Sequence, residues 1–102
     1  MAEIFDRAHF AHMTGDDAAL QREIIGLFQG QAAAWTKALD PAAPDPAWRD
    51  AAHTLKGSAR GIGFWALAEA CERAEAAQGG DIAPALRELL GALNAALAAA
   101  HG

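Results

Sequence analysis

The stretch DPAWRDAAHTLKGSARGIG, residues 45–63, decides the fold because its apolar residues repeat at helical spacing. Steps of three and four residues place side chains on one face of a helix. The predicted buried stripe is Trp48, Ala52, Leu55, Ala59 and Ile62. Asp45 is expected to cap this helix, with Pro46 at the first position, where a missing amide proton costs nothing. Gly61 and Gly63 are expected to end it.

Four more helices are expected around this one, over residues 5–13, 17–39, 64–78 and 81–100. Asp16 and Asp81 are predicted as N-caps. The residues expected to face inward are Phe5, Phe10, Met13, Leu20, Ile24, Leu27, Phe28, Ala32, Trp35, Leu39, Phe64, Leu67, Ala68, Cys71, Ala74, Leu86, Leu89, Leu90, Leu93 and Leu97. Because short connections favour antiparallel neighbours, the sequence predicts an all-α, antiparallel up-down four-helix bundle with a short extra N-terminal helix. Residues 1–102 are expected to form one domain.

Composition narrows the classes of function. The chain has 102 residues and a formal net charge of −5, and an acidic surface does not attract nucleic acid. No apolar run approaches the ~20 residues of a membrane span, and the N-terminus lacks the basic start and apolar stretch of a signal peptide. The single cysteine, Cys71, has no partner for a disulfide, which favours a reducing cytoplasm.

His53 is the most informative polar residue of the central helix. At 100° per residue it shares a row with Gly57 and Arg60, offset from the buried stripe, so it should be exposed. The residue at i+4 normally covers the surface beside residue i, and here that residue is Gly57. A glycine inside a helix costs about 1 kcal/mol relative to alanine. We expect that Gly57 is tolerated here because the missing side chain leaves the imidazole of His53 accessible.

Three cations are expected around the same opening: Lys56 at i+3, Arg60 at i+7 and Arg49 at i−4. An accessible imidazole among cations suits an anion, and a phosphoryl group on a ring nitrogen is one candidate. A neutral imidazole with a pKa near ~6.5 is a usable nucleophile at cytoplasmic pH.

The segment AHTLKGSARGIGFWALAEACERAE, residues 52–75, resembles the signature of histidine-containing phosphotransfer (Hpt) domains. The matching positions are His53, Lys56, Gly57, Ser58, Gly63, Leu67 and Cys71. The N-terminal segment FDRAHFAHMTGDDAALQREIIGLF, residues 5–28, is similar to the family's lead-in of a short helix, a Thr-Gly-Asp turn and a long helix. The resemblance therefore covers the order of elements in nearly the whole chain.

The resemblance implies that His53 accepts a phosphoryl group from an aspartyl phosphate on a receiver domain and passes it to another receiver. Lys56 and Gly57 would assist, and Ser58 would be a close neighbour. Mg²⁺ would arrive with the receiver, so this chain is expected to hold no cofactor or metal. The family often carries a polar residue opposite the histidine, where Glu75 falls. Its carboxylate would orient a neutral ring and repel a phosphorylated one.

Several other residues have side chains that could serve a function. Phe64 and Trp65 are predicted to form an exposed apolar rim that a partner covers. His9 and His12 stand three residues apart near Asp6, but without a third firm ligand they predict no metal site. Cys71 lies in an apolar stripe and is interpreted as a small core residue.

The predicted function is that of a phosphoryl carrier in a two-component phosphorelay, without its own kinase or ATP-binding site. The expected partners are receiver domains of response regulators and a hybrid histidine kinase, and the protein is expected to be monomeric. Nucleic acid and membrane are not expected partners. The alternative is a non-catalytic helical adaptor that binds receivers or other signalling proteins.

Overall fold

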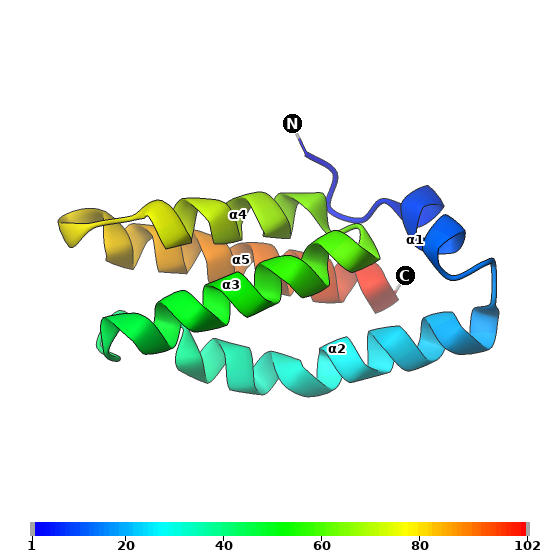
Figure 1. The fold of residues 1–102 in the computed structure, drawn as a ribbon, viewed down its shortest axis with the longest axis horizontal. Coiled ribbons are helices and arrows are strands. Elements are labelled where there is room, and N and C mark those ends of the chain that lie inside the picture. Colours follow the sequence, from blue (N-terminus) through cyan, green and yellow to red (C-terminus); the bar gives the residue numbers. More distant parts are fainter. Residues whose placement is uncertain (1, 102) are drawn as a thin grey trace.

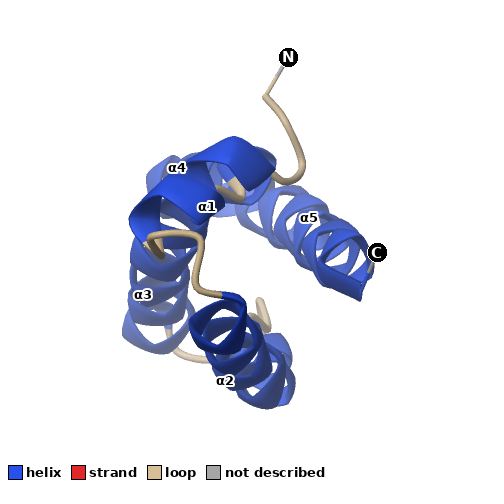
Figure 2. Ribbon diagram, turned by 90° about the vertical axis from the view of Figure 1, so that its right-hand side faces the viewer, coloured by secondary structure: helices blue, strands red, loops and turns tan. Residues whose placement is uncertain are grey.

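The computed structural model describes residues 2–101 (Figure 1). Its helices are α1 (Arg7–Met13), α2 (Ala18–Ala38), α3 (Asp45–Ile62), α4 (Trp65–Ala76) and α5 (Ile82–His101), with a short 3-10 turn, η1 (Gly79–Asp81), before α5. The four long helices run alternately in opposite directions, and α1 lies across one end of them (Figures 1 and 2). No strand occurs between residues 2 and 101. The predicted all-α bundle with a short N-terminal helix is confirmed.

The core lies mainly between α3, α4 and α5. All members of the predicted stripe of α3 are buried: Trp48, Ala52, Leu55, Ala59 and Ile62. Opposite them lie Phe64, Leu67 and Cys71, and α5 contributes Leu86, Leu89 and Leu93. Full burial of a large apolar side chain stabilises a fold by about 1.5–3 kcal/mol. These residues therefore fix α3 and α4 side by side, and the candidate site is built on that pair.

Helix α2 packs less fully than predicted. Phe28 and Trp35 are buried along it, and Leu39 is buried at its end. Leu20 is exposed, and Leu27 is 62% exposed, so the prediction that both face inward is wrong. Met13 of α1, also expected inside, is 59% exposed. The reason is that α2 turns only a narrow stripe toward the bundle, which leaves its flank open to solvent.

Several helix boundaries differ from the prediction. The N-cap of α2 is Asp17, whose Oδ1 accepts a bond from the Leu20 amide at 3.1 Å, while Asp16 takes a left-handed conformation with φ of 60°. Helix α3 already begins at Asp45, which pairs with Arg49 one turn later and does not cap. Asp81 lies in η1 and is not the cap of α5. Helix α4 ends at Ala76 because the backbone is extended at Ala77.

Gly63 is the cap that ends α3, with a left-handed φ of 102°. Gly61 lies within α3 and does not end the helix. The N-terminal segment closes over this corner: the Asp6 amide donates to the Gly63 carbonyl at 2.8 Å, and the Ala66 amide donates to the Glu3 carbonyl at 2.9 Å. Any side chain at position 63 would meet the Asp6 carbonyl, which explains the glycine.

The predicted rim of Phe64 and Trp65 is wrong, because the N-terminal segment covers both residues. Phe64 is fully buried, and its ring packs against Phe5 and Phe28. Trp65 is half-buried, and its Nε1 donates to Asp6 Oδ2 at 2.9 Å. This hydrogen bond is the main reason that the pKa of Asp6 is lowered. The N-terminal segment therefore occupies the corner of α3 and α4, and no exposed apolar rim forms there.

One segment, Gly79–His101, is long and apolar enough to cross a membrane by length and composition alone. The sequence-based expectation that no such segment exists was wrong in that respect. The leucine stripe of α5 packs against the bundle. The exposed positions of α5 include Arg87, Glu88, Asn94 and His101, so the solvent side of the helix carries polar side chains.

Candidate functional site

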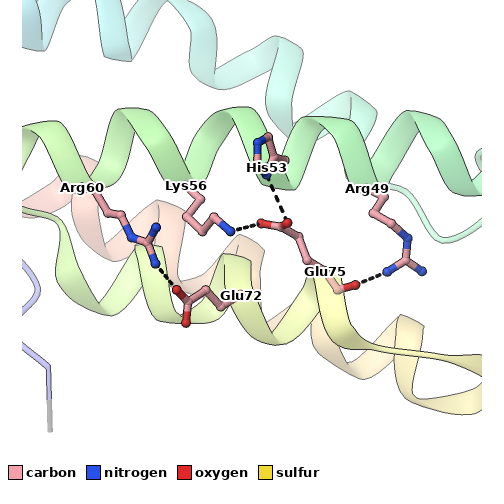
Figure 3. Close-up of polar contacts among 6 residues, drawn as sticks. All are labelled: Arg49, His53, Lys56, Arg60, Glu72 and Glu75. Carbon is pink, nitrogen blue, oxygen red and sulfur yellow. Dashed lines mark hydrogen bonds and ion pairs between the residues drawn. The ribbon is translucent and has the colours of Figure 1, made fainter.

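His53 stands in the middle of α3 with its ring directed away from the core (Figure 3). Its side chain is 71% exposed, as the helical geometry predicted. The ring has one hydrogen-bond partner among residues 2–101, which is Glu75 of α4. An exposed imidazole supported on one side only leaves its other nitrogen open to an incoming group.

Glu75 joins His53 to Lys56. Its Oε2 lies 3.2 Å from His53 Nδ1, and its Oε1 lies 2.8 Å from Lys56 Nζ (Figure 3). The Glu75 side chain is only 22% exposed. Burial alone would raise the pKa of Glu75, but Lys56 and His53 together outweigh it and lower the pKa below its ordinary value of 4.5. Glu75 is therefore ionised at neutral pH.

The charge of Glu75 determines which ring nitrogen carries the proton. An ionised carboxylate accepts hydrogen bonds and donates none, so Nδ1 of His53 must be the donor. In a neutral imidazole the second nitrogen, Nε2, then keeps its lone pair. The geometry thus presents Nε2 as a nucleophile on an exposed ring.

The two arginines predicted near His53 have other partners. Arg49 pairs with Asp45 and donates to the carbonyl oxygens of Glu75 and Ala77, so it ties the start of α3 to the end of α4. The hydrogen bonds from Arg49 also lower the pKa of Asp45. Arg60 pairs with Glu72. The expected ring of three cations is therefore wrong, because carboxylates and carbonyls of α4 face both arginines.

A groove opens beside the site on the side of α2. It has a volume of about 350 Å³ and a mostly apolar lining. Gly57, Ser58 and Gly61 form its α3 wall, and α1 and α2 contribute Phe10, Met13, Thr14, Ile24, Leu27, Phe28 and Gln31. A side chain at position 57 would meet nothing within 4 Å, so the space next to Gly57 is open as predicted.

The remaining candidates have structural settings. His9 packs on the Trp65 ring, with 4.9 Å between the centroids, and the residues from 2 to 101 contain no cluster able to hold a metal ion. Cys71 is buried, and burial raises the pKa of its thiol to about 12, so the thiol stays protonated and unreactive. Its interpretation as a small core residue is confirmed.

Two likenesses to known proteins bear on this site. Residues 17–101 match the Hpt domain family. The chain belongs to the Hpt family. The structure of this Hpt domain is also similar to the crystal structure of the histidine phosphotransferase ShpA from Caulobacter crescentus, with a TM-score of 0.82 and 40% sequence identity. That match covers 97% of this chain and 88% of the ShpA chain. Comparison with curated protein sequences gives no significant match.

Family membership gives this Hpt domain its role, which is histidine phosphotransfer in a phosphorelay. Its partners are accordingly receiver or kinase proteins of such relays. The sequence-based prediction of the family, the fold class and the phosphorelay role is confirmed.

Sequence reasoning missed two parts of the site. It did not find the brace made by Arg49, although a cation facing the C-terminus of a neighbouring helix is a common arrangement. It also treated Leu27 and Met13 as core, whereas both line the groove. The two glycines inside α3, Gly57 and Gly61, could have indicated the groove from the sequence. Both line its α3 wall, where α2 does not fill the space left by the missing side chains.

Proposed function

We propose that His53 is the phosphoryl acceptor of this Hpt domain and that Nε2 is the attacking atom. The observation that carries the proposal is the bond between His53 Nδ1 and Glu75, which leaves the lone pair on the exposed nitrogen. Nε2 attacks the phosphorus of an aspartyl phosphate in line with the bond to the aspartate. The N–P bond forms as the P–O bond breaks, and the carboxylate leaves with the bonding pair.

The neighbours of His53 have supporting roles in this proposal. Lys56 supplies a positive charge one turn from the ring, which offsets the charge of the phosphoryl oxygens. Gly57 and Ser58 keep the approach open. The partner receiver brings Mg²⁺ and the acidic pocket, so this chain needs no cofactor of its own. We further propose that the domain acts as a monomer in the cytoplasm and that a hybrid histidine kinase is one of its partners.

The groove beside Gly57 is proposed as the surface on which the receiver docks. Gly57 and Ser58 line the groove within about a turn and a half of His53. A receiver whose apolar surface packs into the groove would therefore have its active site close to the imidazole. Leu27 and Met13 are the most exposed large apolar residues on its rim. Such exposed apolar groups gather at interfaces more than on the rest of a surface.

The substitution Leu27→Glu tests the docking surface. It should weaken binding of a receiver domain about tenfold or more, because a charge would be buried against an apolar surface. Stability should change by no more than about 0.5 kcal/mol, since Leu27 is exposed. The affinity is measured by titration calorimetry. Leu20→Glu is the matched control, an exposed leucine of α2 outside the groove, and equal losses in both variants would contradict the proposal.

The substitution Gly57→Ala should stabilise the protein and slow phosphotransfer. Alanine removes a helix penalty of about 1 kcal/mol, and its methyl group enters open space without a clash. The same methyl group narrows the approach to His53. Urea denaturation gives the stability, and rapid mixing with a phosphorylated receiver gives the rate. Gly91→Ala, in an open position of α5, should bring the same gain in stability with an unchanged rate. Equal rates in all three proteins would refute the explanation of Gly57.

The proposed acceptor is tested by locating the phosphoryl group. After incubation with a labelled phosphorylated receiver, the label should be acid-labile and base-stable and should map to the peptide that contains His53. Label on a peptide containing His9, His12 or His101 would contradict the assignment. A receiver that binds without transferring label would instead favour the adaptor.

A further inference from the structure

Glu75 contacts the imidazole on the nitrogen opposite the proposed attacking atom. Its Oε2 lies 3.2 Å from Nδ1, and the carboxylate is far less exposed than the ring it touches. Charges that are partly withdrawn from water interact more strongly than charges on the open surface. Glu75 is therefore placed to affect the ring in its phosphorylated state as well as in its resting state.

The phosphorylated ring differs from the resting ring in charge. If His53 accepts a phosphoryl group on Nε2, as proposed above, Nδ1 keeps its proton and the ring becomes cationic. Glu75 contacts Nδ1 and would then attract the ring, whereas the repulsion expected from the sequence concerns the phosphoryl oxygens on the other nitrogen. In the next transfer, a carboxylate oxygen of the second receiver attacks phosphorus, and the electron pair of the N–P bond returns to Nε2. The leaving group is then neutral imidazole. If Nδ1 has first lost its proton, the leaving group is an imidazolate anion, which departs far more slowly.

We propose that Glu75 is a positioning residue that keeps Nδ1 of phosphorylated His53 protonated and so keeps the phosphoryl group transferable at higher pH. An opposite charge within about 4–6 Å favours the charged form of a titrating group by about one to three pH units. Lys56 binds the other oxygen of the same carboxylate and reduces this effect. We therefore expect Glu75 to raise the pH at which Nδ1 loses its proton by about one pH unit, the lower end of that range.

The other groups around the ring do not replace Glu75. From α3, Lys56 carries the same sign as the ring, and Arg49 and Arg60 are bound to other acceptors. Asp50, three residues before His53 on α3, is exposed and forms no hydrogen bond or ion pair with the ring. From α4, Glu72 pairs with Arg60, and the thiol of Cys71 is uncharged. Among the described residues of α2, none forms a hydrogen bond or ion pair with His53. Glu75 is thus the one anion in contact with Nδ1 between residues 2 and 101.

The substitution Glu75→Gln removes the charge and keeps an oxygen that accepts from Nδ1. Both proteins are phosphorylated with phosphoramidate, a small chemical donor, so loading does not depend on a receiver. The protonation of Nδ1 is followed by ¹⁵N NMR between pH 5 and 9, together with the rate of discharge to a receiver. In Glu75→Gln the pH midpoint for loss of the Nδ1 proton should fall by about one pH unit. Discharge should be about tenfold slower at pH values above both midpoints and unchanged below both.

Glu72→Gln is the matched control, since it removes a carboxylate of α4 that does not touch the ring. Its midpoint should equal that of the parent protein. An unchanged midpoint in Glu75→Gln, or equal shifts in both variants, would overturn this inference. If His53 of the parent protein takes up no phosphoryl group from phosphoramidate or from receivers, the proposed function itself fails, so the two failures are distinguishable.

Discussion

The variant His53→Gln is expected to lose phosphoryl acceptance, with a rate at least about a thousandfold below that of the parent protein. The amide of glutamine is not a nucleophile, so no other atom at this position can take the place of Nε2. The exposed ring makes no packing contact in the core, and glutamine is a good helix former, so the fold should be retained. The loss would therefore reflect chemistry and not unfolding.

The measurement is the rate at which label moves from a phosphorylated receiver to the protein. Circular dichroism confirms that the variant remains helical. His12→Gln is the matched control, because His12 is an exposed histidine of α1 at the end of the bundle, and this variant should transfer at the parent rate. Transfer to His53→Gln at a rate comparable to the parent would show that the acceptor lies elsewhere.

The variant Gly63→Ala is expected to lose about 2–4 kcal/mol of stability, the largest loss predicted for a single methyl group in this chain. The backbone at Gly63 has a φ of 102°, which residues with a side chain rarely adopt. A Cβ atom there would lie 2.8 Å from the carbonyl oxygen of Asp6 and 3.3 Å from the His9 ring. The N-terminal segment would have to move away from the corner of α3 and α4.

Urea denaturation measures this loss as a lower midpoint at a similar slope. Gly61→Ala is the matched control, two residues earlier within α3, where a methyl group enters open space. It should stabilise the protein by about 1 kcal/mol. The distinctive result is that the free energy of unfolding falls in Gly63→Ala and rises in Gly61→Ala. A loss below about 0.5 kcal/mol in Gly63→Ala would contradict the strain inferred at the corner.

Helix α3 could be predicted from the sequence because its pattern is local. The stripe from Trp48 to Ile62 has the period of one helix face, and the exposure of His53 follows from the same geometry. The placement of Glu75 opposite His53 also agreed with the structure, but it came from the family resemblance and not from periodicity. A spacing within one helix is fixed by backbone geometry, whereas a contact between two helices depends on how they pack.

The incorrect predictions concern contacts between elements. Phe64 and Trp65 looked exposed because the sequence does not show that residues 3–6 fold back over them. Arg49 and Arg60 looked like partners of His53 because their spacing along α3 fits, yet long side chains turn toward acceptors on the neighbouring helix. Leu27 looked buried because its spacing matches Phe28 and Ile24, but α2 has a free flank.

The slight burial of α2 has a consequence for how the domain meets a partner. Over its 21 residues, only Phe28 and Trp35 are buried, yet the helix forms one wall of the groove beside His53. Local opening in a protein begins where few apolar contacts hold a segment. Backbone amides of α2 should thus exchange with deuterated water sooner than those of α3 and α4. A docked receiver would slow that exchange. Restricting the motion of α2 would cost conformational entropy, which would lower the net binding free energy.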